Sequence, residues 1–227
     1  MAGKTHGISI DRVHTHEIDT LLNLYVDLFH GREPLTKCIG FSRKRMISVA
    51  RTMHAGSNMN VLAQGLCWIA RDRAAANRSV GFIACDDPAA AGGQEMPDGL
   101  TDREIEMVSA VAALLEEIRR PVKDRLALGA GTCLHVTAVG VAWEYEGAGI
   151  AARLLQTALR EAKARGFLHA FAECTSPASR KCHEKAGFKS LHGISGNTFL
   201  VDGGYPFKGC HLDIHLMWKR LGEEKTP

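Results

Sequence analysis

The stretch from Val139 to Arg160 constrains the fold of this chain more than any other. The apolar run CLHVTAVGV, rich in β-branched residues, predicts a buried strand that ends at Val141. A short turn with Gly147 and Gly149 leads directly into GIAARLLQTALREAKARG, whose amphipathic spacing predicts a helix. Glycines let the backbone approach a ligand, and the first amides of a helix have no internal partners. The unit therefore predicts an anion site suited to a pyrophosphate, with a tight strand–helix turn as the alternative.

The glycine turn differs from the dinucleotide-binding fingerprint. Ala152 stands where the third glycine of G-x-G-x-x-G would fall. The turn also comes after more than half of the chain and lacks a repeated βαβ pattern around it. A dinucleotide-dependent oxidoreductase is therefore excluded as a main interpretation.

The other periodic segments predict one mixed α/β (α+β) domain, with no linker that divides it and no internal repeat. Thr101 followed by Glu104 has the capping-box pattern of a helix start, and Ser176-Pro177 has the signature of a short helix that runs to Ala186. Helices are expected over 15–30 (with Thr15 as a possible cap), 42–55 and 101–126, and a loop between the first two. A hairpin is expected over 66–71 and 79–85, a loop over 86–99, and further strands over 167–175, 187–195 and 208–218.

Composition excludes several classes of function. Twenty-eight Lys plus Arg against twenty-five Asp plus Glu leave a net charge of +3, too small to indicate a nucleic-acid partner. The sequence shows neither an apolar run of the roughly 20 residues that span a membrane nor a secretory signal. Its seven cysteines, an odd number without a C-x-x-C pair, argue against a disulfide framework and a zinc site. We therefore expect a cytoplasmic protein without a metal or a membrane partner.

Cys210, His211 and His215 are the best candidates for metal ligands. However, CHLDIHLMW alternates in the manner of a strand, with Leu212, Ile214 and Leu216 on one face. Cys210 would share that face, while the two histidines would point the other way. No metal site is expected there.

The pattern V-x-x-x-Y-x-G-x-G-I-A, followed by a helix, a strand, a short helix and K-A-G-F, resembles the GNAT superfamily of N-acetyltransferases. In that family the turn and helix hold the pyrophosphate of acetyl-coenzyme A, and their signature begins with Gln or Arg. Here Glu146 stands first, which is tolerable where its backbone amide alone is used, with Arg153 or a nearby lysine to compensate. The resemblance implies that these residues bind the cofactor: Val139, Gly140, Val141, Glu146, Gly147, Ala148, Gly149, Ile150, Ala151, Ser176 and Ser179.

Three separate segments resemble the insect-type arylalkylamine (dopamine) N-acetyltransferases. They are FHGREPL, ECTSPASRKCHEKAGF and YPFKGCHLDIHLMWKRL. The resemblance covers residues 15–221, with 42–100 poorly matched. It implies a single domain over 1–227 with a central, mostly antiparallel sheet flanked by helices, and an acetyl-CoA-binding core over about 132–190.

Amide formation from a thioester requires a neutral amine. An alkylamine with a pKa near 10.4 is free base in only about one molecule in 10³ at pH 7, a deficit of roughly 4–5 kcal/mol, so a general base is the main requirement. The resemblance places the family's glutamate, which works through ordered water, at Glu33. The alternatives for Glu33 are a solvated loop charge or a helix cap, and Glu173 at a strand end is a rival base.

A general acid for the departing thiol is the smaller requirement. Many GNAT enzymes use a tyrosine four residues before the helix-ending Gly-Phe, and here that position is His183. The insect-type members have serines or threonines instead, matched by Thr175 and Ser179. Ser179 and His183 share a helix face, so one of them is expected to donate to the sulfur or to hold coenzyme A. The alternative is a partly exposed His183 and a Ser179 that contacts the pantetheine arm.

The sequence does not identify the molecule that accepts the acetyl group. We expect acetylation of a primary amine of a small molecule, an arylalkylamine first, with a polyamine, an antibiotic or a protein N-terminus as alternatives. A non-catalytic acyl-CoA-binding module is a different class that Glu146 and His183 keep open. Either a monomer or a homodimer is compatible with the sequence. Four aromatic residues are candidates for an amine pocket, with a place in the core as the alternative: Trp68, Phe82, Trp143 and Tyr145.

Overall fold

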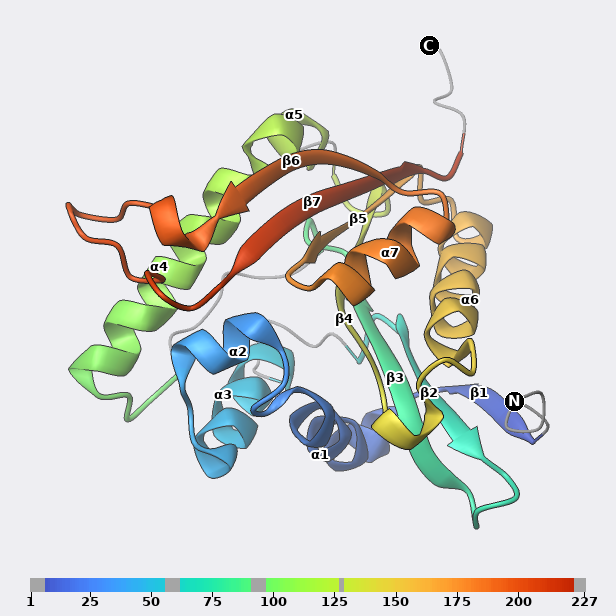
Figure 1. Cartoon of the computed structure of the whole chain (residues 1–227). Coiled ribbons are helices and arrows are strands. Elements are labelled where there is room, and N and C mark those ends of the chain that lie inside the picture. The colour runs from blue at the N-terminus through green and yellow to red at the C-terminus, as the bar shows by residue number, and fades with distance from the viewer. Residues whose placement is uncertain (1–6, 56–61, 91–96, 127–128, 223–227) are drawn as a thin grey trace.

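A seven-stranded sheet with the order β1-β2-β3-β4-β5-β7-β6 forms the centre of the protein (Figure 1). The computed structural model describes residues 7–55, 62–90, 97–126 and 129–222. Neighbouring strands are antiparallel except β4 and β5, which confirms the mostly antiparallel sheet. The strands are β1 (Ile8–Arg12), β2 (Cys67–Asp72), β3 (Arg78–Asp86), β4 (Cys133–Val141), β5 (His169–Cys174), β6 (Lys189–Ser195) and β7 (Asp213–Arg220).

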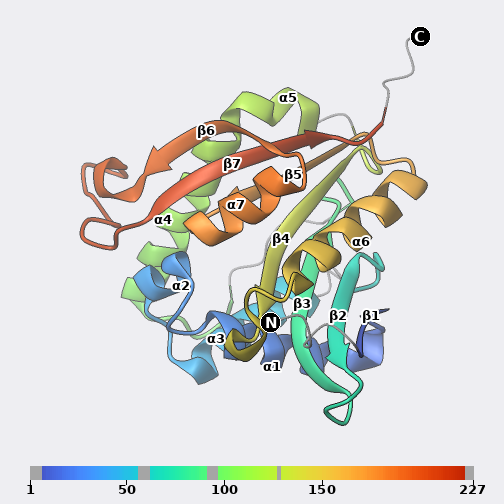
Figure 2. The same ribbon diagram turned by 45° about the vertical axis from the view of Figure 1, so that its right-hand side comes forward.

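Helices cover both faces of this sheet because the strands alternate apolar side chains between them. On β3, Ile83 packs with the apolar face of α6, whereas its neighbour Phe82 packs with α1 on the opposite side (Figure 2). Leu114 of α4 belongs to a further cluster with Phe171 of β5. The helices are α1 (Ile18–Phe29), α2 (Pro34–Ile39), α3 (Arg43–Ala55), α4 (Asp102–Arg119), α5 (Lys123–Leu126), α6 (Ile150–Ala164) and α7 (Pro177–Lys185).

The sheet opens in its middle, where β4 and β5 form its one parallel pair of strands among the described residues. β4 and β5 pair only over Cys133–His135 and His169–Phe171, although β4 continues to Val141 and β5 to Cys174. Beyond these residues the edge of β4 that faces β5 has no ladder partner within the described part of the chain. Helix α6 packs on β2, β3 and β4, while α7 packs on β5, β6 and β7, so the two helices flank this break.

Most elements lie where the sequence predicts them. The capping box at the start of α4 is confirmed: the Thr101 hydroxyl accepts from the Glu104 amide at 3.3 Å, and the Glu104 carboxylate accepts from the Thr101 amide at 2.8 Å. The Ser176 hydroxyl caps α7 by accepting from the Ser179 amide. Thr15 does not cap a helix but begins a 3₁₀ turn that leads into α1.

The secondary structure differs from the prediction at four places. Strand β1 was not predicted, and helix α2 replaces the loop expected after the first helix. The expected helix over 101–126 is interrupted after α4 by a 3₁₀ turn at Arg120–Val122, because Pro121 cannot donate a backbone hydrogen bond. Strand β7 begins at Asp213 rather than at 208, and His211 before it has a φ of 52°.

None of the described helices combines the length and the apolar character that a membrane crossing needs.

Candidate active site

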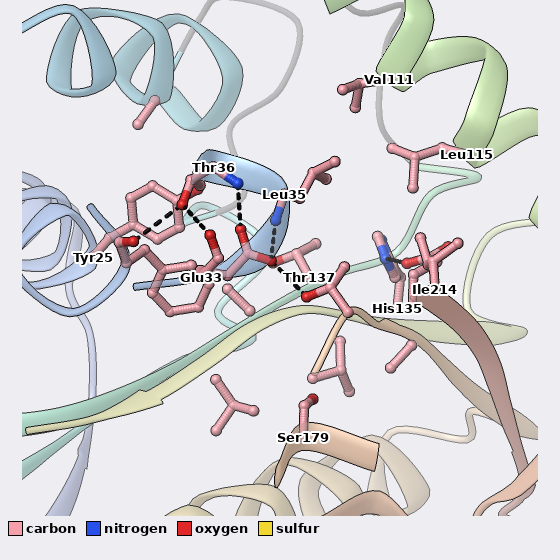
Figure 3. Close-up of a pocket in the computed structure, with 18 of the residues that line it drawn as sticks. Tyr25, Glu33, Leu35, Thr36, Val111, Leu115, His135, Thr137, Ser179 and Ile214 are labelled. Carbon is pink, nitrogen blue, oxygen red and sulfur yellow. Dashed lines mark hydrogen bonds and ion pairs between the residues drawn. The ribbon is translucent and has the colours of Figure 1, made fainter. Parts of the chain in front are cut away.

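A cavity of about 460 Å³ lies where β4 and β5 separate, and residues of α1–α4 and of α7 line it. Its walls are mainly apolar, and Figure 3 shows Val111 and Leu115 of α4 on the opposite side of it from Tyr25. Its polar groups come from the strands, from the cap of α2, from the end of α4 and from α7. The apolar side chains that line it include Phe29, Leu35, Ile39, Phe41, Met46, Val49, Val108, Val136, Val139 and Ile214.

Glu33 lies in this cavity and also caps α2. Its extended backbone (φ −74°, ψ 131°) suits a residue before proline, and Pro34 opens the helix. The Glu33 carboxylate accepts from the amides of Leu35 at 3.0 Å and Thr36 at 2.7 Å (Figure 3). The Thr175 hydroxyl donates to the same carboxylate at 2.5 Å from the end of β5, 142 residues away. The cap alternative is therefore confirmed, and it holds Glu33 in the pocket rather than in solvent.

Glu173 takes part in a buried charge cluster. The Arg119 Nε donates to one oxygen of Glu173 at 2.5 Å, and the other oxygen lies 2.8 Å from His135 Nε2. The second ring nitrogen of His135 lies 2.9 Å from Asp86. Burial alone would lower the pKa of His135, but the charges of Glu173 and Asp86 raise it to about 9. Burial opposes ionisation of Glu173, yet His135 and Arg119 hold its pKa well below the usual range, so Glu173 is a poor base.

His183 is buried rather than partly exposed, with 1% of its surface accessible. Its Nδ1 lies 2.9 Å from the carbonyl oxygen of Ser179, so Nδ1 carries the proton. Its Nε2 is buried and has no hydrogen-bond partner in the described ranges. Burial also lowers the pKa of His183. A neutral ring whose one proton is already bonded does not suit a general acid.

Ser179 and Cys174 lie beside this ring. The Ser179 hydroxyl donates to the sulfur of Cys174 at 3.2 Å, and His183 Nδ1 lies 3.3 Å from the same sulfur. Burial raises the pKa of Cys174 to about 12, so its thiol is a weak nucleophile at neutral pH. Ser179, Ser176 and Thr175 all line the cavity, which brings the predicted hydroxyl residues together with Glu33.

The glycine turn has the form of an anion cradle. Helix α6 begins at Ile150, and its first internal bond runs from the Arg153 amide to the Gly149 carbonyl. Within the described residues, no acceptor is bonded to the amides of Gly147, Gly149, Ile150, Ala151 and Ala152. Both glycines have positive φ, and a Cβ at either would meet nothing within 4 Å. The turn therefore offers a row of free donors to solvent and fits a pyrophosphate.

The prediction that Arg153 compensates the negative charge of Glu146 is wrong. Glu146 pairs with Arg32 at 2.6 Å, whereas the guanidinium of Arg153 donates to the carbonyl of Ile8 at 3.0 Å. A Cβ at Gly140 would lie 3.0 Å from Phe29 and 3.1 Å from Phe82. Gly140 thus allows close packing of β4 on α1.

None of the four aromatic candidates lines the cavity. Trp68 and Phe82 lie in the core, Trp143 is 72% exposed, and the Tyr145 hydroxyl donates to Asp72 at 2.7 Å. Sequence reasoning missed the aromatic residues that do line it: Tyr25, Phe29 and Phe41. Their signal was the i, i+4 spacing of Tyr25 and Phe29 on the first helix, where the rings stack 4.8 Å apart.

Among the described residues, no group of three or more His, Cys, Asp or Glu is placed to hold a metal ion.

Comparison with solved structures shows the same fold over nearly the whole chain. The C-terminal condensation domain of Ebony, in complex with beta-alanyl-dopamine, is 18% identical with a TM-score of 0.77, over 94% of this chain and 98% of that one. A mosquito arylalkylamine N-acetyltransferase like 5b is 21% identical with a TM-score of 0.71, over 94% and 100%. The Drosophila melanogaster polyamine N-acetyltransferase is 17% identical with a TM-score of 0.70, over 94% and 100%.

Comparison with curated proteins finds no match. The model of the acetyltransferase (GNAT) family matches residues 58–188, which is more than half of the chain. Its match includes the glycine turn, the break between β4 and β5, and α7. The protein therefore belongs to the GNAT family of acetyltransferases and is an N-acetyltransferase.

Proposed function

We propose that this protein transfers the acetyl group of acetyl-CoA to the primary amine of an arylalkylamine, with Glu33 as the general base. One observation carries the proposal: a carboxylate held by two amides and a hydroxyl faces a largely apolar pocket at the break between β4 and β5. The free amides of the glycine turn support the choice of a pyrophosphate-containing donor.

Acetyl-CoA, when bound, supplies the thioester carbon that the amine nitrogen attacks and the sulfur that leaves as a thiolate. Glu33 accepts the proton of the ammonium, directly or through water, and the hydroxyl of Thr175 keeps the carboxylate oriented. The Ser179 hydroxyl donates to the Cys174 sulfur in the structure, and a rotation about its C–O bond would turn the same proton toward the leaving sulfur. The buried thiol of Cys174, with its raised pKa, argues for direct transfer rather than an acetyl-enzyme.

The charges in the pocket favour a monoamine over a polyamine. Three carboxylates line the cavity, but Asp86 and Glu173 are both engaged by His135, and Glu173 also by Arg119. Within the described residues, Glu33 is the lining carboxylate that has no ion pair. A polyamine would need a second free anion for its second ammonium group, whereas the apolar walls suit an aromatic ring.

The test is thiol release from acetyl-CoA with tyramine, tryptamine, dopamine, spermidine, an aminoglycoside and a peptide amine. We expect release with the arylalkylamines and a loss of about 10²–10⁴-fold in kcat for Glu33→Gln. Asp27→Asn serves as the matched control, because Asp27 is an exposed acid on α1 outside the cavity. Preference for spermidine would overturn the arylalkylamine assignment, and binding of coenzyme A without any release would identify a non-catalytic module.

A further inference from the structure

An exposed ion pair joins the two functional segments of the site. Arg32 Nη2 lies 2.6 Å from Glu146 Oε1, although 114 residues separate them in sequence. The two side chains are 43% and 60% exposed, so the pair itself adds little to stability. Its position is what matters, because Arg32 directly precedes Glu33 and Glu146 directly precedes the glycine turn.

The glycine turn has the amides for a pyrophosphate but carries a negative side chain at its start. Five backbone N–H groups of the turn and of the first turn of α6 have no acceptor in the described ranges. The neighbouring carboxylate of Glu146 would repel a pyrophosphate, and Arg153 is engaged with the Ile8 carbonyl. Arg32 is the cation that an observed ion pair brings to this carboxylate.

We propose that Arg32, which is adjacent in sequence to the candidate base Glu33, binds a phosphate group of the cofactor. The inference rests on the proposed use of coenzyme A. A guanidinium has five donors in a planar fork, so one edge can remain on Glu146 while the other bonds a phosphate oxygen. Arg32 thereby supplies the positive charge that an Arg supplies at the position of Glu146 in the usual pattern. A phosphate held by Arg32 also fixes the backbone next to Glu33.

The experiment measures equilibrium binding by calorimetry with two probes, coenzyme A and pantetheine, which lacks the phosphates. We expect Arg32→Ala to weaken the binding of coenzyme A about tenfold and to leave pantetheine unchanged. Glu146→Gln should bind coenzyme A at least as tightly as the unmodified protein. The matched control is Arg51→Ala, which removes an exposed arginine paired with Asp19 between α3 and α1.

The double variant Arg32→Ala/Glu146→Gln distinguishes a direct bond from Arg32 to the phosphates from mere neutralisation of the Glu146 charge by Arg32. If Arg32 bonds the phosphates, the double variant binds coenzyme A more weakly than Glu146→Gln alone. If Arg32 only neutralises Glu146, the two bind equally, and the proposal is overturned. Unchanged affinity of Arg32→Ala overturns it as well. Failure of the unmodified protein to bind coenzyme A would instead overturn the proposed function.

Discussion

The side chain of Glu33 both caps helix α2 and lines the cavity. As the cap of α2 it accepts from two amides, and this fixes the direction of its carboxylate. The Thr175 hydroxyl then joins it to the end of β5. Three donors thus hold the carboxylate in one geometry, which a general base requires and which supports the proposed role of Glu33.

Removal of the Thr175 hydroxyl tests this arrangement. Thr175→Val should lower kcat/KM about tenfold or more, because a hydrogen bond to a charged group is worth roughly 1.5–3 kcal/mol. Thr175→Ser keeps a hydroxyl and should restore most of the rate. Thr198→Val, at an exposed threonine distant in sequence, is the control in the same steady-state assay. Equal rates for Thr175→Val and the unmodified protein would contradict the role of Thr175.

His183→Phe tests whether the ring has a structural role. The burial-lowered pKa means that the folded state binds fewer protons than the unfolded state, so stability falls as the pH drops from 7 through 6.5 and below. The variant should lose less stability between pH 7 and pH 5 in urea titrations, with the pH profile of kcat/KM unchanged. His30→Gln, at an exposed histidine, should behave like the unmodified protein. If His183→Phe removed one of the ionisations seen in the pH profile of kcat/KM, the result would support His183 as the general acid.

At the scale of elements, α2 is the informative difference from the prediction. Its signals are present in the sequence: Glu33 before Pro34 at the start, and Gly40 with a φ of 73° at the end. Six residues are too few to show helical periodicity, so the sequence pattern predicts a loop there. Helix α2 matters because its cap is the candidate base.

Helix α4 lines the cavity with Val108, Val111 and Leu115. Thr101→Ala removes the side-chain half of its capping box and should lower the free energy of unfolding by about 1 kcal/mol. Urea denaturation measures this change. Ser109→Ala, at an exposed serine within the same helix, should be neutral or slightly stabilising because alanine favours the helix interior. Because the cap lies away from the reacting groups, kcat should not change in either variant.

At the scale of the whole molecule, the cluster of Asp86, Arg119, His135 and Glu173 connects β3, α4, β4 and β5. Each partner comes from a different element, and the His135 ring also stacks on Phe171 at 4.5 Å. The cluster lies at the break between β4 and β5, where the ladder ends. Charged side chains thus join the two halves of the sheet beside the cavity.

The stability of the protein should therefore depend on His135 at alkaline pH. Its folded pKa of about 9 lies above the ordinary 6.5, so its contribution is complete below pH 6.5 and is lost as the pH rises through 9. Between pH 7 and pH 10 the unmodified protein should lose roughly 1–3 kcal/mol more than His135→Gln. Thermal and urea unfolding across this range measure the difference. Parallel curves for the two proteins would rule out this role.

Local sequence is enough to predict most of the elements and the glycine turn. Period-2 and helical spacing, capping residues at Thr101 and Ser176, and the glycines of the turn act over a few residues, so local sequence is sufficient to predict them. The five-residue β1 is too short for its alternation to stand out. The placement of Glu33 as the base came from the resemblance of its segment to a family, and it stays a proposal.

Tertiary structure alone decided which distant groups meet. The pair Glu33–Thr175 spans 142 residues and the pair Arg32–Glu146 spans 114, and no local pattern encodes either contact. Packing also buried His183 and gave Glu173 two cationic partners, which decided the protonation of both. A pKa depends on desolvation and on charges from other elements, so it is a property of the folded molecule and not of the sequence around the residue.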